Sequence, residues 1–212
     1  GELTLPRSVA VNSHGDVFLS EYTTVDRIQG FAANHQPLLC FGQPGTRDGE
    51  FNRAEGLGID GEDRIYVADS CNHRIQLFSK NGRWLKTFGR AGRGNGELSY
   101  PYDVRVDREG RQYVCEFGNS RIQVFNARHE FLEIIGEAGS KPGQFNNPWA
   151  IALDSRGNLY VADAGNHRVQ KLVALTSESV TSNQSSVRAT SLRRSMTGSL
   201  ITDRLITTAP AR

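Results

Sequence analysis

One stretch decides how this chain is organised: Asp69-Ser70-Cys71-Asn72-His73-Arg74-Ile75-Gln76-Leu77-Phe78. Its arginine recurs every 47 residues, at Arg27, Arg74, Arg121 and Arg168, and each time Ile-Gln or Val-Gln follows. A fixed period held over so long a stretch indicates tandem copies of one structural unit. The chain is therefore expected to fold as four repeats.

Each repeat has the pattern of four short antiparallel strands. In the second repeat, strands are expected at 57–59, 65–68, 74–78 and 84–88, separated by turns rich in Asp, Asn and Gly. Four strands in about 47 residues are typical of one β-propeller blade. The sequence therefore predicts an all-β fold of four four-stranded antiparallel blades, at residues 1–42, 49–89, 96–136 and 143–173.

These motifs resemble the NHL repeat family. The match is clearest in the stretch quoted above and in Asp163-Ala164-Gly165-Asn166-His167-Arg168-Val169-Gln170. Blade one departs from the pattern with Val25-Asp26 in place of Asn-His, and blade three has Asn119-Ser120. The resemblance covers residues 1–173 and implies a β-propeller, most often of six blades. Four blades would form an open arc of such a ring, whose exposed end blades could self-associate.

The tail, residues 174–212, differs in composition from the blades. From Thr176 on, 15 of 37 residues are Ser or Thr, with no aromatic residue. Such a segment buries too little apolar surface to offset the entropy of ordering. We predict a disordered tail, with short helical fragments around Leu200 to Ile206 as the alternative, and a fourth blade without its outer strand.

The composition of the 212 residues is that of a soluble globular protein, at 37% hydrophobic and 23% charged. Its apolar runs are too short for a membrane-spanning segment. Residues 1–173 carry 20 basic and 21 acidic side chains, which argues against a strong nucleic-acid binder but leaves room for a local basic patch. The three cysteines form no CxxC pair, and His73 and His167 share one repeat position two blades apart. No metal site, catalytic residue or cofactor is therefore expected.

Four acid–arginine pairs recur, one in each blade. They flank a tight turn, where the two side chains can meet across the mouth of a hairpin: Glu21 with Arg27, Asp69 with Arg74, Glu116 with Arg121, and Asp163 with Arg168. They could line a site, but a catalytic site is used once and these pairs occur in every blade. A structural role in fixing each hairpin is the preferred interpretation.

Positions that vary between blades are better candidates for binding. The residue after the Pro position of each blade is Arg7, Glu55, Tyr102 or Trp149, at the start of the innermost strand, and Phe117 lies in a nearby turn. Propeller geometry places these residues on one face, here called the top face, where an aromatic and charged mixture suits recognition. The alternative is that the aromatic side chains pack between blades.

The most favoured function is a non-catalytic scaffold that recognises a protein or another macromolecule through the top face. The resemblance leaves two alternatives. Amidating lyases are zinc enzymes on a related propeller, which suggests a metal-assisted lyase or hydrolase acting in the central channel. Some NHL proteins bind RNA, which suggests RNA binding on the top face. The sequence does not indicate a cellular compartment.

Overall fold

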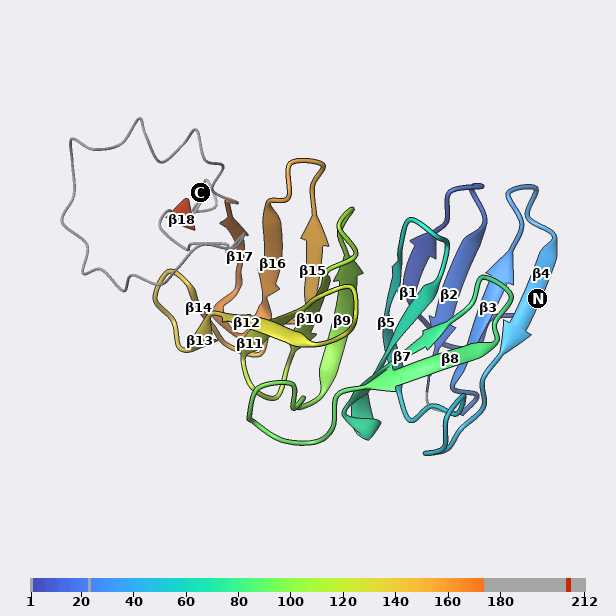
Figure 1. Cartoon of the computed structure of the whole chain (residues 1–212), viewed down its shortest axis with the longest axis horizontal. Coiled ribbons are helices and arrows are strands. Elements are labelled where there is room, and N and C mark those ends of the chain that lie inside the picture. The colour runs from blue at the N-terminus through green and yellow to red at the C-terminus, as the bar shows by residue number, and fades with distance from the viewer. Residues whose placement is uncertain (1, 23, 174–204, 207–212) are drawn as a thin grey trace.

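The computed structural model describes residues 2–22, 24–173 and 205–206, and it forms four antiparallel sheets (Figure 1). Blade one contains β1 (Pro6–Val11), β2 (Val17–Glu21), β3 (Arg27–Phe31) and β4 (Pro37–Phe41). Blade two contains β5 (Ala54–Ile59), β6 (Ile65–Asp69), β7 (Arg74–Phe78) and β8 (Trp84–Phe88). Blade three contains β9 (Pro101–Val106), β10 (Gln112–Glu116), β11 (Arg121–Phe125) and β12 (Phe131–Ile135). Blade four contains β15 (Ala150–Leu153), β16 (Leu159–Asp163), β17 (Arg168–Leu172) and β18 (Leu205–Ile206).

The strand order within each blade follows the sequence, so that every blade is a simple meander. Aspartates shape the turn between the first and second strands: in blade two, Asp60 Oδ1 accepts the backbone N–H groups of Glu62 and Arg64. Such Asx turns let a short loop reverse the chain. The predicted all-β fold of four four-stranded blades is confirmed.

The blades follow one another along an arc, from the blue N-terminal blade to the orange fourth blade in Figure 1. Their inner strands contact in the order β1, β5, β9, β15. These strands approach closely where glycine leaves room. A Cβ atom on Gly56 of β5 would lie 2.5 Å from the Cα atom of Asp103 in β9. The inner strands of blades two and three are thus in backbone contact.

The links between blades add a buried apolar residue to the preceding blade. Phe51, Leu98 and Phe145 have no exposed surface, and each packs against a glycine that follows the outer strand of the preceding blade. The link after blade three also holds a short parallel pair, β13 (Glu137–Ala138) with β14 (Gln144–Phe145). Consecutive blades therefore share their hydrophobic cores.

The fourth blade corrects one expectation. It was predicted to lack an outer strand, but Leu205–Ile206 pairs antiparallel with Lys171 and Leu172 of β17. These two residues are a strand and not the helical alternative. Strand β17 offered a free edge, and backbone pairing satisfies its polar groups. The remaining tail residues, 174–204 and 207–212, lie outside the described part of the chain, and the disorder prediction for them stays a prediction.

Helical structure in the described ranges includes two single 3₁₀ turns, η1 (Ser70–Asn72) and η2 (Ala164–Asn166), which join the second and third strands of blades two and four. Among these residues there is no helix with the length and apolar character needed to cross a bilayer.

Candidate binding site at the top face

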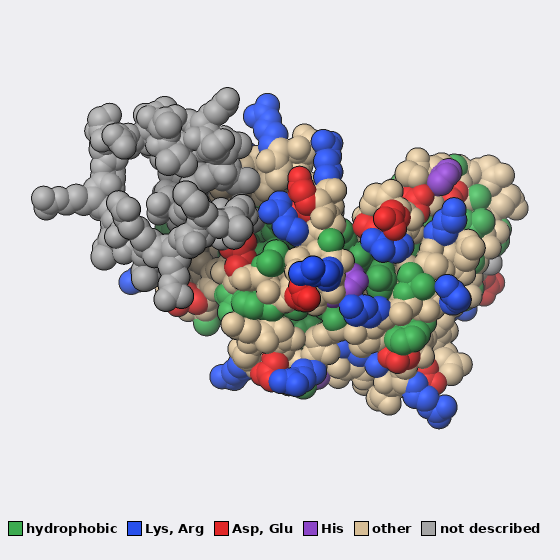
Figure 2. All heavy atoms as spheres, viewed as in Figure 1, with side chains coloured by type: hydrophobic (Ala, Val, Ile, Leu, Met, Phe, Trp, Pro, Cys, Tyr) green, Lys and Arg blue, Asp and Glu red, His purple; other side chains and the backbone are tan. Residues whose placement is uncertain are grey.

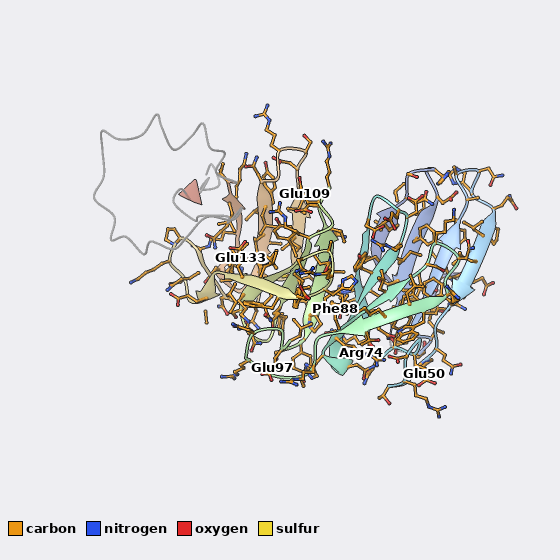
Figure 3. All side chains as sticks on the ribbon, in the orientation of Figure 1. Glu50, Arg74, Phe88, Glu97, Glu109 and Glu133 are labelled. Carbon is orange, nitrogen blue, oxygen red and sulfur yellow. The ribbon has the colours of Figure 1, made fainter. Side chains whose placement is uncertain are left out.

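The arc has two faces, which lie on opposite sides of the view in Figure 3. The top face carries the links between blades and the turns between second and third strands; it points down the page, where Glu50, Arg74 and Glu97 are labelled. The bottom face carries the turns between first and second strands, and Glu109 marks it at the upper edge. The predicted binding residues belong to the top face.

The repeated acid–arginine pair lies at this face. In blade two, Arg74 Nε lies 2.7 Å from Asp69 Oδ2, and the carboxylate has no exposed surface. Gln76 Nε2 donates to the same oxygen at 3.0 Å, and the backbone N–H of Asn52 donates to Oδ1 at 2.8 Å. Arg74 also donates to the carbonyl of Glu50 at 2.9 Å. The pair thus fixes the link that enters the blade.

The same arrangement occurs in the other three blades. The arginine Nε to carboxylate distance is 2.8 Å for Arg27 with Glu21, 2.7 Å for Arg121 with Glu116 and 2.8 Å for Arg168 with Asp163. Burial raises the pKa of Asp69 even though its hydrogen bonds and Arg74 oppose this. Burial also raises the pKa of Glu21, but the hydrogen bonds from Arg27, Thr4 and Gln29 outweigh this effect, and the pKa of Glu21 is lowered.

Three of the predicted binding residues form one aromatic cluster. The Tyr102 and Phe117 rings stack at 4.5 Å between centroids, and Trp149 meets the Tyr102 ring edge-on at 5.3 Å. Trp149 is 41% exposed, whereas Tyr102 is only 8% exposed. Tyr102 therefore forms the buried base of the cluster, and Trp149 forms its solvent-exposed side.

The two charged members join this cluster from blades one and two. Glu55 is buried, and its two carboxylate oxygens accept from two arginines: Arg7 Nε on one side and Arg53 Nε, at 2.6 Å, on the other. The Arg7 guanidinium also lies 4.8 Å from the Trp149 ring centroid. Since Arg7 belongs to β1 and Trp149 to the start of blade four, this cation–π contact spans the inner edge of the arc.

Sequence reasoning missed Arg53. Its guanidinium lies 5.5 Å from the Tyr22 ring centroid and 5.6 Å from that of Tyr102, so it belongs to the cluster as fully as Arg7. A signal was available: Arg53 precedes the Pro position of its blade, and the equivalent residues Leu5, Tyr100 and Asn147 differ in character. We call the seven residues Arg7, Tyr22, Arg53, Glu55, Tyr102, Phe117 and Trp149 the mouth cluster.

The mouth cluster has unused hydrogen-bonding capacity. Arg7 Nη2 is buried and has no hydrogen-bond partner among the described residues. The cluster contains two guanidinium groups and one carboxylate. Flat aromatic surface beside two guanidinium groups suits a partner that combines an apolar or planar group with a hydrogen-bond acceptor or an anion.

A hollow of about 730 Å³ lies at the opposite, bottom face. Figure 2 shows this side at the upper edge, where acidic and basic side chains rim a notch. Its lining includes Asp60, Asp107 and Asp154, which occupy one repeat position. Each of them accepts two backbone N–H groups of its own turn through Oδ1. These carboxylates are committed to turns, so the hollow is the weaker candidate for a site.

The histidines and acids of the described residues do not form a group of three that could hold one metal ion. His73 Nδ1 accepts the backbone N–H of Tyr100 at 3.1 Å, so this histidine joins blade two to blade three.

Comparison with known proteins agrees with the repeat pattern. The family model of the NHL repeat matches residues 51–78 and 145–172. The chain thus carries NHL repeats, in a four-blade propeller arrangement. A comparison with curated protein sequences finds no match.

Solved structures share the fold at low sequence identity. A streptogramin B lyase matches with a TM-score of 0.60 and 14% identity, over 78% of this chain and 50% of its own. Virginiamycin B lyase from Staphylococcus aureus matches with a TM-score of 0.61 and 16% identity, over 80% and 53%. The WD40 repeats of RRP9 match with a TM-score of 0.64 and 14% identity, over 81% and 49%. The chain therefore spans about half the length of each of these propellers.

Proposed function

We propose that this chain is a binding scaffold that recognises a protein ligand through the mouth cluster of its top face. The observation that carries this proposal is convergence. Residues that differ from blade to blade, contributed by all four blades, meet in one partly exposed cluster. Positions shared by every blade serve folding, and variable positions that converge are free to form one specific site.

The chemistry of the cluster supports protein recognition. Tryptophan, tyrosine and arginine are the side chains that contribute most at protein interfaces, and a half-exposed tryptophan can become fully buried on binding. Trp149 is such a residue, held in place by Arg7 and Tyr102. Propeller folds serve both binding proteins and enzymes, so the low-identity lyase structures support the fold and leave the activity open.

The test uses a displayed library of random peptides, selected on the full chain. Selected peptides should lose on the order of thirtyfold in affinity when Trp149→Ala removes an anchor of about 2 kcal/mol. Trp84→Ala is the matched control, because Trp84 is 38% exposed on the outer strand β8, away from the mouth cluster. The affinity of the Trp84→Ala variant for the same peptides should stay unchanged.

Two outcomes would contradict the proposal. Equal losses for Trp149→Ala and Trp84→Ala would mean that peptides bind without the mouth cluster. Binding of a uridine homopolymer that depends on Arg7 and Arg53 and weakens steeply with salt, with no peptide selected, would favour RNA instead. Circular dichroism melting of each variant should match the parent, which separates a lost site from a lost fold.

A further inference from the structure

The front of blade one exposes positions that are buried in every other blade. Val9 of β1 is 56% exposed, whereas its counterparts Leu57, Val104 and Ile151 are 0%, 0% and 3% exposed. Val11 is 58% exposed, and its counterparts Ile59, Val106 and Leu153 are half-buried. In blades two to four this face packs against the blade before it. In blade one the described chain provides no preceding blade.

The rear of blade four is open in the complementary way. Val169 of β17 is 58% exposed, and its counterparts Ile28, Ile75 and Ile122 have no exposed surface. Tyr160 is half-buried, whereas Tyr66 and Tyr113 at the same position are buried. Lys171 stands where Leu77 and Val124 stand, with its amine 5.3 Å from the centroid of the Tyr160 ring.

The apolar link residue repeats this contrast. Phe51, Leu98 and Phe145 are fully buried against the preceding blade, and their counterpart Leu3 is 42% exposed. Leu3 is thus an apolar side chain that has the position of a blade-joining residue, with no preceding blade among the described residues.

A hydrogen bond from a backbone N–H group to a side chain also marks each joint between blades. The residue before the repeated arginine accepts the N–H group 27 residues later: Asp26 from Arg53 at 2.9 Å, His73 from Tyr100 at 3.1 Å, and Ser120 from Asn147 at 3.2 Å. His167 holds this position in blade four. Within residues 2–22 and 24–173 its ring has no hydrogen-bond partner, and it is exposed.

We propose that the front of blade one in one copy of this chain docks on the rear of blade four in a second copy, head to tail. The same joint forms three times inside the described chain, so the two end faces present matching positions of such a joint, with Lys171 as a charged substitution on the rear face. His167 would accept the N–H group of Leu5 in the second copy, because Leu5 precedes Pro6 as Tyr100 precedes Pro101.

This joint is heterologous, so it generates a closed ring or an open chain of copies. It leaves the top face free and is independent of the proposed peptide recognition. Contiguous apolar faces of this kind are typical of surfaces that bind another protein chain.

Light scattering coupled to size exclusion tests the joint on the full chain. The parent should be a dimer or larger and dissociate on dilution. Val9→Asp and Val169→Asp should each weaken association on the order of a hundredfold, because each would bury an unpaired carboxylate in the joint. Leu132→Asp is the matched control: Leu132 is 48% exposed on outer strand β12, outside both end faces, and its substitution should leave association unchanged.

Mixing the two variants gives the decisive result. Val9→Asp keeps an intact rear face and Val169→Asp keeps an intact front face, so an equimolar mixture should form a heterodimer although neither variant associates alone. A monomeric parent at every concentration would overturn the proposal. So would association lost in one variant and retained in the other, which would mean that identical faces meet.

Discussion

Arg74 and Asp69 form a buried ion pair at the entrance of blade two, with 2.7 Å between Nε and Oδ2. The arginine also donates to the carbonyls of Arg47 and Glu50, in the link that enters the same blade. The Arg74 side chain thus connects the second and third strands of blade two to the link that precedes them. The recurrence of this arginine in all four blades supports the prediction of a structural role for the pair.

Arg74→Ala should lower the free energy of unfolding by about 1–3 kcal/mol, because it leaves a buried carboxylate with fewer donors. Urea denaturation measures the change. Arg90→Ala is the control: Arg90 is 81% exposed in its pair with Glu97, and removing an exposed pair changes stability by less than about 1 kcal/mol. A variant that unfolds like the parent but loses peptide binding would instead place Arg74 in the site.

Gly56→Ala should destabilise the arc by about 1–3 kcal/mol, the usual effect of overpacking a tight contact. The added Cβ atom would meet the backbone of Asp103 and Tyr102, at 2.5 and 2.7 Å, so inner strands β5 and β9 would have to separate. Gly61→Ala is the matched control, since a Cβ atom there has nothing within 4 Å. Equal urea midpoints for the two variants would show that the close contact between Gly56 and the β9 backbone does not hold the inner strands in register.

His129 makes a contribution to stability that should be lost in mild acid. Burial, together with the charges of Lys86 and Arg64, lowers the His129 pKa from 6.5 to about 4, and the ring stacks on Phe88 at 4.9 Å. The unfolded chain takes up the proton at higher pH than the folded chain does. The contribution of neutral His129 is therefore complete above pH 6.5 and is lost as the pH falls toward 4.

His129→Asn removes this titration, so the parent should lose about 1–2 kcal/mol more than the variant between about pH 7 and about pH 4.5. Urea denaturation at the two pH values gives the comparison. The exposed His35 has the same turn position in blade one, with φ of 68°, and His35→Asn is the matched control for the substitution itself. Burial raises the pKa of Asp103 to about 6, so Asp103 stabilises the folded chain as the pH falls. This contribution is the same in the parent and both variants, and it cancels when their losses of stability are compared. An identical acid loss in the parent and His129→Asn would contradict the prediction.

The sequence by itself determined the blades. The 47-residue spacing from Arg74 to Arg121, the alternating strands and the Asp- and Gly-rich turns all encode contacts within one hairpin, which local residue preferences specify. The contact between Asp69 and Arg74 was predictable in the same way, because both residues flank one turn.

Only the tertiary structure decided how the blades meet. Three features of the mouth cluster depend on the twist and packing angle of successive sheets, which no local pattern encodes. They are the distance from Arg7 to the Trp149 ring, the burial of Tyr102 beneath that ring, and the position of Arg53 beside Glu55. The outer strand at Leu205–Ile206 likewise arose from a free backbone edge, which accepts a strand with little regard to its side chains. Val169 has the same apolar character as Ile75, and its exposure depends only on whether another blade lies against it.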